Sequence, residues 1–178
     1  MKNNYYRGIV IVRRKEEYYF LQYLRSNFHL PIKVFQVNLD SDIKKIDYLS
    51  NYKKLCKDIY IEKEKNKMKN FFIMLVSDVN TIKNISDKNE TIKKENLKEF
   101  WFEEYVIPIY MSCNFKELLV KIGAINEKEK LDITTYMKLV PINDPEIAKL
   151  AMKNLAEQLG KNEESNFEIL LEKFLEFL

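Results

Sequence analysis

Four short runs of almost uninterrupted apolar residues constrain the fold of this chain more than any other feature of its sequence. The runs cover residues 8–12, 32–37, 71–76 and 106–111 and are rich in β-branched and aromatic side chains. A strand that is apolar on both faces has to be covered on both faces, which is typical of the parallel sheets of α/β proteins. We therefore expect buried strands here, with 8–12, 71–76 and 106–111 as neighbours in one parallel sheet.

The segments between these runs have the spacing of helices. Residues 16–28 place Phe20, Leu24 and Phe28 in one row, four residues apart, and residues 46–59 also carry apolar positions near one stripe. Strands that alternate with helices predict an α/β fold with a mostly parallel sheet of about four strands and helices on both faces.

A polar stretch at 77–96 interrupts this alternation, and residues 97–105 then return to a helical pattern. A loop of that length inside a compact domain is usually functional or mobile. The chain has 178 residues, of which 46% are apolar. These values suit one domain over 1–178, with the C-terminal part packed on it.

The C-terminal part predicts two helices. Asp144 and Pro145 are typical of an N-cap and a first helical position, and Gly160 is typical of a helix end. Ser165 and Glu168 have the spacing of a capping box for the last helix. The expected apolar stripe of the first helix is Ile147, Leu150, Ala151, Leu155 and Leu159, and that of the second is Phe167, Leu170, Leu171, Phe174, Leu175 and Leu178.

An apolar helix face most often packs into the core, and we expect that for the C-terminal helices at 144–178. The alternative is a surface that binds a protein partner or a second copy of the chain. No apolar run approaches the 18 residues of a membrane span, and the first residues lack the apolar core of a secretory signal. We therefore expect a cytoplasmic protein with no membrane contact.

Several classes of catalytic site are excluded by residue type. The three glycines are isolated, so the chain has no glycine-rich phosphate loop. The one histidine, His29, lies in a turn and leaves no Ser-His-Asp triad. Cys56 and Cys113 lie far apart without ligand spacing, so we expect reduced thiols and no zinc site.

The charge is distributed unevenly along the chain. Residues 1–70 carry 16 Lys and Arg against 8 Asp and Glu, whereas residues 144–178 carry 4 against 8. A basic N-terminal half provides an electrostatic footprint for nucleic acid. The simpler interpretation is a solvated lysine-rich helix face.

Asp78, Asn80 and Asp87 form the most suggestive group of polar residues. Asp78 follows the run 71–76 almost directly, and ligands of open parallel sheets bind beyond the carboxyl ends of the strands. Carboxylate and amide oxygens two residues apart suit one hard cation such as Mg²⁺, which polarises phosphate or activates water. The alternative is that Asp and Asn at a strand end simply begin a turn.

The order of the elements resembles the Toprim superfamily, in particular its small RloB-like members, which are linked with bacterial defence against phage. The resembling segments are residues 9–20 (IVIVRRKEEYYF), 73–80 (IMLVSDVN), 109–119 (IYMSCNFKELL) and 166–175 (NFEILLEKFL). The resemblance implies a Toprim-like fold and an activity that cleaves or joins nucleic-acid strands.

In that family a glutamate after the first strand and an Asp-x-Asp motif after the third hold a divalent metal. The resemblance implies that Asp78 occupies the first aspartate position and Asn80 the second. It implies catalytic roles for Asp78 and for Glu16 or Glu17, with Mg²⁺ bound by Asp78 and Asn80. Asp87, downstream of this pair, is a further candidate metal ligand.

The glutamate position departs from the family pattern. The first strand continues into Arg13, Arg14 and Lys15, and the nearest carboxylates follow later, at Glu16 and Glu17. Two arginines would repel a cation, but they could contact phosphate and so bind nucleic acid. Glu117, at the start of the helix after the fourth strand, is a further candidate ligand.

Three interpretations stay open from the sequence. The first is a Toprim-like, Mg²⁺-dependent nuclease with a degenerate metal site, acting in defence. The second is a non-catalytic α/β protein that binds nucleic acid or a protein partner. The third is another flavodoxin-like or Rossmann-like domain with an unrelated ligand.

Overall fold

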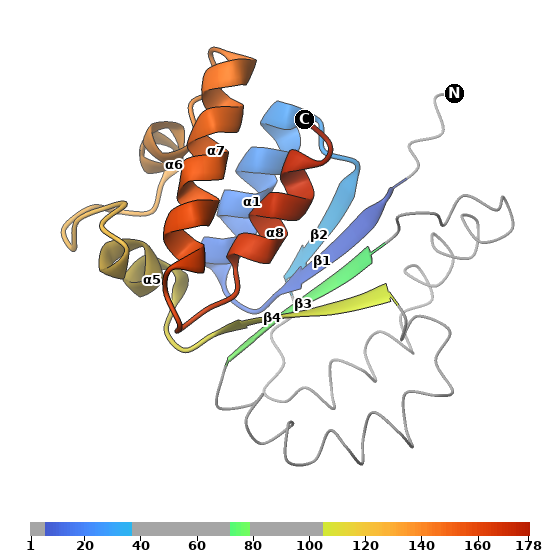
Figure 1. The fold of residues 1–178 in the computed structure, drawn as a ribbon, viewed down its shortest axis with the longest axis horizontal. Helices are drawn as coiled ribbons and strands as arrows, with labels where there is room; N and C mark the ends of the chain where they lie inside the picture. The colour runs from blue at the N-terminus through green and yellow to red at the C-terminus, as the bar shows by residue number, and fades with distance from the viewer. Residues whose placement is uncertain (1–5, 37–71, 79–104) are drawn as a thin grey trace, which may run out of the picture.

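The structure is a computed structural model that describes residues 6–36, 72–78 and 105–178. Figure 1 shows its elements, which follow one another in the order β1 (Gly8–Val12), α1 (Lys15–Phe28), β2 (Ile32–Gln36), β3 (Phe72–Asp78), β4 (Val106–Met111), α5 (Phe115–Lys121), α6 (Ile133–Leu139), α7 (Pro145–Gly160) and α8 (Glu168–Leu175).

The four strands form one open sheet in the order β2-β1-β3-β4, and every neighbouring pair is parallel. Val10 of β1 lies opposite Val34 on one side and Met74 on the other, and Asp78 of β3 lies opposite Met111 of β4. The α/β class is therefore confirmed, and the three apolar runs expected to be neighbours are neighbours.

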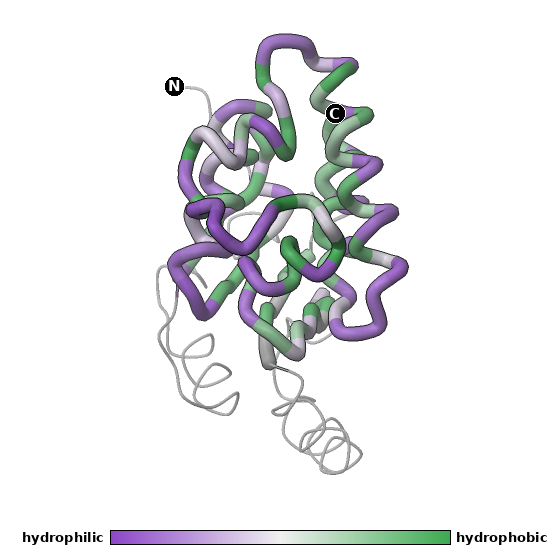
Figure 2. Tube along the Cα trace, turned by 90° about the vertical axis from the view of Figure 1, so that its left-hand side faces the viewer, coloured by the Kyte–Doolittle hydropathy of each residue, from purple (hydrophilic) through white to green (hydrophobic). Residues whose placement is uncertain are grey.

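The helices of the described chain gather on one face of the sheet (Figure 1). The core lies between them and the sheet, because the side chains that point to this face form one buried cluster with the helices. Its members include Val10, Met74 and Ile109 from the sheet, and Phe20, Phe115, Phe167 and Phe174 from the helices and the segments next to them. Figure 2 shows hydrophobic and hydrophilic positions alternating along the helices, as expected for elements with one face in a core.

The second face of the sheet carries Ile9, Ile11 and Ile73, which alternate with the core residues and are also buried. Burial on both faces explains why the strands are almost continuously apolar. The expected second layer of helices depends on residues 46–59 and 97–104, which lie outside the described residues.

Helix α1 begins and ends with backbone groups that find partners. Arg14 is extended before the helix, and its N–H donates to the carboxylate of Glu17 at 3.3 Å. His29 ends the helix in the left-handed region, with φ of 51°, and its N–H donates to the carbonyl of Arg25. The turn position expected for His29 is therefore confirmed, and its role is that of a C-cap.

The predicted stripe of α7 is wrong at its N-terminal end. The helix begins as expected, because the side chain of Asp144 accepts from the N–H groups of Glu146 and Ile147. However, Ile147 and Leu150 are 54% and 59% exposed. The buried row is Ala148, Met152, Leu155, Ala156 and Leu159. This row has the same helical spacing, and its two alanines allow close packing on the neighbouring helix.

The capping box predicted for α8 is also wrong. The helix starts at Glu168, and the hydroxyl of Ser165 accepts from the N–H of Phe167 at 2.9 Å. Ser165 instead pairs with Met111 in an antiparallel bridge, which holds its backbone in the β conformation. One carboxylate oxygen of Glu168 is consequently buried without a hydrogen-bond partner among the described residues.

The apolar face of α8 is mostly buried against the body, as expected. Phe167, Leu170, Leu171 and Phe174 are fully buried, whereas Leu178 at the end of the chain is 38% exposed and was wrongly expected to be buried. In the described part of the chain, no helix has the length and apolar character that crossing a membrane requires.

Candidate functional site

The strand order creates one position where a ligand is expected. From β1 the chain continues to β2, which pairs with one edge of β1. The next strand, β3, pairs with the opposite edge of β1. In open parallel sheets, ligands bind outside the carboxyl ends of the strands where the order reverses in this way. Here those ends are followed by residues 13–17, which connect β1 to α1 and begin that helix, and include Asp78, the last residue of β3.

Glu17 is the acid that the fold brings to this position. It is the third residue of α1, its side chain is 2% exposed, and one carboxylate oxygen accepts the N–H of Arg14. Burial raises the pKa of Glu17 to about 7, while the N–H groups of Arg14 and Arg13 and the charge of Arg14 act in the opposite direction. A carboxyl group that titrates near neutral pH in such a place is a functional-site candidate.

The structure distinguishes Glu16 from Glu17, which the sequence offered as equal candidates. Glu16 is only partly buried, and its backbone carbonyl accepts from the hydroxyl of Tyr136 at 3.5 Å. Burial, followed by the charge of Glu16, raises the pKa of Tyr136 to about 12. Of the two, Glu17 alone is buried, so it is the better candidate for a functional carboxylate at this position.

A signal for Glu17 was present in the sequence. Glu17 lies three residues before Phe20 and four before Leu21, so it continues the apolar row that faces the core. A carboxylate in such a row is either buried with its apolar neighbours or placed at the end of the helix. Glu17 lies in the first turn of α1, so it satisfies both conditions.

The basic turn follows β1 as the sequence indicated. Arg13 and Arg14 are partly buried and Lys15 is exposed. The side chain of Gln36, at the end of β2, donates to the carbonyl of Arg13 at 3.5 Å. The turn is therefore joined to the carboxyl ends of two strands, and Lys15 is available to solvent.

The remaining predicted ligands are placed only in part. The backbone of Asp78 ends β3 beside the end of β1, whereas Asn80 and Asp87 lie outside the described residues. Within residues 6–36, 72–78 and 105–178, no three His, Cys, Asp or Glu side chains gather as a metal-binding group. The residue types nevertheless fit a hard cation, because Glu17 and Asp78 are carboxylates that follow adjacent strands.

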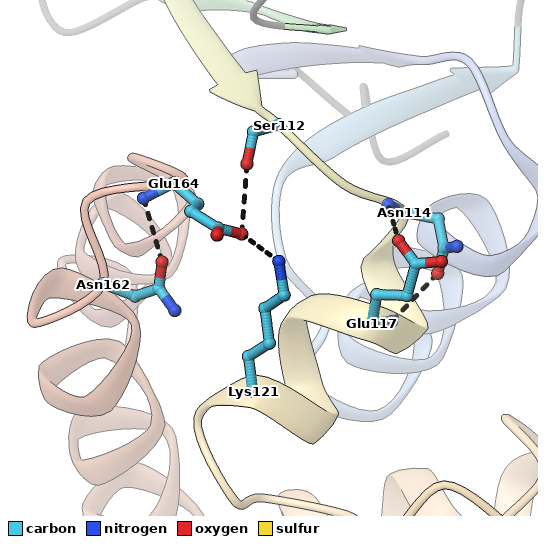
Figure 3. A network of polar contacts seen from close by, with 6 residues as sticks. All are labelled: Ser112, Asn114, Glu117, Lys121, Asn162 and Glu164. Carbon is cyan, nitrogen blue, oxygen red and sulfur yellow. Dashed lines mark hydrogen bonds and ion pairs between the residues drawn. The ribbon is translucent and has the colours of Figure 1, made fainter.

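Glu117 is engaged elsewhere, which removes it from the candidate ligands. Its carboxylate accepts the N–H of Asn114 at 3.2 Å, and the side chain of Asn114 accepts the N–H of Glu117 at 2.9 Å (Figure 3). This reciprocal pair is a capping box that begins α5. Cys113, just before it, is partly buried, and burial raises the pKa of its thiol, which does not favour a nucleophile.

A second polar group, which the sequence did not predict, lies at the end of β4 (Figure 3). Glu164 accepts from the hydroxyl of Ser112 at 3.2 Å and from the ammonium of Lys121 at 2.5 Å. The backbone adds a hydrogen bond from Ser112 to the carbonyl of Glu164 at 2.8 Å. These contacts join α5 and the segment before α8 to the sheet. No local pattern reveals them, because the partners are far apart in sequence.

Comparison with protein-family models, with curated proteins and with solved structures finds no match to this chain. The fold and the site together define an α/β protein with an open parallel sheet. At the position where the strand order reverses, the chain has the buried Glu17, the strand-end Asp78 and the basic residues that follow β1.

Proposed function

We propose that this chain is a Toprim-like protein that acts on nucleic acid, and that its activity is divalent-metal-dependent cleavage of phosphodiesters in bacterial or phage defence. The observation that supports the proposal is the burial of Glu17 at the carboxyl end of β1, next to the strand that ends in Asp78. This pair follows the two strands that supply the glutamate and the first aspartate in the Toprim pattern.

Each part of the site has a chemical role in this proposal. Glu17 and Asp78 would hold the cation, and Asn80 would add a neutral oxygen ligand. Bound Mg²⁺ supplies charge that polarises a phosphate and activates water. Arg13, Arg14 and Lys15 follow β1, the strand that leads to Glu17. Their side chains would bind the phosphates of the substrate.

A non-catalytic binding protein is the second candidate, and one observation favours it. The carboxylate of Glu17 already accepts a hydrogen bond from the backbone of Arg14, and two arginines precede it by three and four residues. A buried carboxylate that already has hydrogen-bond and charge partners within the protein needs no bound cation for stability. In that case the basic turn would bind nucleic acid and nothing would be cleaved.

Thermal unfolding with and without Mn²⁺ or Mg²⁺ separates the two candidates. A cation that binds only the folded protein raises its melting temperature by mass action. We expect that increase in the wild type and in the control Glu16→Gln, and we expect it to be lost in Glu17→Gln and Asp78→Asn. Cleavage of single-stranded and duplex oligonucleotides should follow the same pattern.

The control variant is closely matched, because Glu16 and Glu17 have the same charge and adjacent positions. If neither cation changes the melting temperature of the wild type, the metal-dependent activity is contradicted. The binding protein is then the remaining candidate, provided that oligonucleotides still bind. If Glu16→Gln and Glu17→Gln lose the increase equally, the assignment of the ligand to Glu17 is wrong.

A further inference from the structure

The outer face of α1 carries an exposed aromatic side chain beside the basic turn. Tyr19 is 55% exposed, whereas Phe20 and Tyr23 of the same helix are buried in the core and Tyr18 and Phe28 are partly buried. In the described ranges, Tyr19 is the one aromatic among the large hydrophobic residues that are exposed. Single exposed apolar residues are common, so its surroundings decide whether it has a role.

The first relevant neighbour of Tyr19 is Lys15. It lies four residues before Tyr19 and is also exposed, so the two side chains occupy one outer stripe of the helix. Lys15 also belongs to the turn that follows β1, where the substrate phosphates of the proposed site would lie. Tyr19 is therefore within one helical turn of the expected path of a nucleic-acid backbone.

The second relevant neighbour of Tyr19 is Tyr18. Its ring packs partly into the core and meets the ring of Tyr19 edge-on, with the centroids 5.6 Å apart and the planes at 68°. An edge-to-face contact of this kind favours one orientation of the exposed ring. Tyr19 therefore offers a partly ordered π-face rather than a freely rotating one.

From these observations we infer that Tyr19 stacks on an unpaired base of a single-stranded nucleic acid whose phosphates contact Lys15. The inference rests on the proposed function and specifies its substrate class. A paired base in an undistorted duplex keeps both faces within its stack, whereas an unpaired base offers a free face to an aromatic side chain on a protein surface. A protein partner is less well matched, because the positive charge beside Tyr19 complements phosphate.

Fluorescence anisotropy with labelled oligonucleotides tests the inference, in EDTA to prevent cleavage and at one fixed salt concentration. Single-stranded DNA and RNA are both titrated, since both present unpaired bases, and each is compared with its duplex. We expect tighter binding of a single strand than of the duplex. Tyr19→Ala should weaken single-strand binding by roughly 5- to 100-fold, as expected for the loss of one stacked base, and leave duplex binding unchanged.

Three further variants make the result specific. Tyr19→Phe keeps the ring and should bind as the wild type does. Lys15→Ala should weaken the binding of both forms, because a phosphate contact is lost. Leu150→Ala removes another exposed side chain from α7 and should change neither form.

The outcomes distinguish this inference from the proposed function. If Lys15→Ala weakens binding but Tyr19→Ala does not, the stacking inference fails and the proposed function stands. If the wild type binds neither form, both fail. If Tyr19→Ala changes the oligomeric state in sedimentation without altering oligonucleotide binding, Tyr19 belongs to a protein interface and the inference is overturned.

Discussion

At the scale of single residues, the burial of Glu17 makes the stability of the metal-free protein depend on pH. The unfolded chain releases this proton near pH 4.5, whereas the folded protein keeps it up to about pH 7. The folded state therefore binds more protons across this interval, and the free energy of unfolding falls as the pH rises. A shift of this size corresponds to roughly 3 kcal/mol.

Glu17→Gln should remove this dependence. In EDTA, the variant should unfold with about the same free energy as the wild type below pH 4.5 and with a higher one at pH 8. Urea unfolding over this range measures the difference. Glu16→Gln serves as the control that keeps most of the wild-type slope, because the charge of Glu16 is the smallest of the contributions to the pKa of Glu17. A difference between Glu17→Gln and the wild type that does not change with pH would show that the pKa of Glu17 is the same in the folded and unfolded states, which contradicts the effect of burial.

The candidate site also shows what single residues reveal in advance. The residue types at 13–17 and at Asp78 are visible in the sequence and indicate phosphate and metal chemistry. The sequence does not directly reveal which glutamate is buried, because that depends on the rotation of α1 about its axis. The row formed by Glu17, Leu21 and Leu24 determines the rotation, and it is evident once the helix is placed on the sheet.

At the scale of elements, the strands were predictable and the helix faces were predictable only in part. The strands are buried on both faces, so their apolar character is independent of orientation. In α7, two overlapping rows have helical spacing, and only packing selects between Ile147 and Ala148. The start of α8 depends on the bridge between Met111 and Ser165, which lie far apart in sequence.

The packing of α8 gives a prediction at this scale. Phe174 is fully buried, so Phe174→Ala should lower the free energy of unfolding by roughly 3–5 kcal/mol. Leu178→Ala, at a partly exposed position three residues after the end of α8, should have a much smaller effect. Thermal and urea unfolding measure both variants.

Sedimentation of the same variants addresses the alternative of a partner-binding helix. If Phe174→Ala keeps its stability but dissociates an oligomer, the apolar face of α8 is an interface between copies. If neither stability nor oligomeric state changes, Phe174 is not part of a core or of an interface, which would contradict the described packing.

At the scale of the whole molecule, the strand order determines where the polar residues of the chain meet. The order β2-β1-β3-β4 places the end of β1 beside the end of β3, although the two strands are far apart in sequence. The alternation of strands and helices predicts a parallel sheet, but many strand orders satisfy it. The position of the site therefore follows from the topology, and the residues at the site were already suggested by the sequence.

The central claim is that this edge of the sheet holds a divalent cation between Glu17 and Asp78. A crystal structure of the protein soaked in Mn²⁺ tests it most directly, because the anomalous signal of the metal locates it independently of the protein atoms. We predict an anomalous peak bounded by the carboxylates of Glu17 and Asp78, which disappears in Asp78→Asn. A fully soaked crystal with no peak at this edge, and with Arg13 or Arg14 paired to Asp78 instead, would contradict the claim.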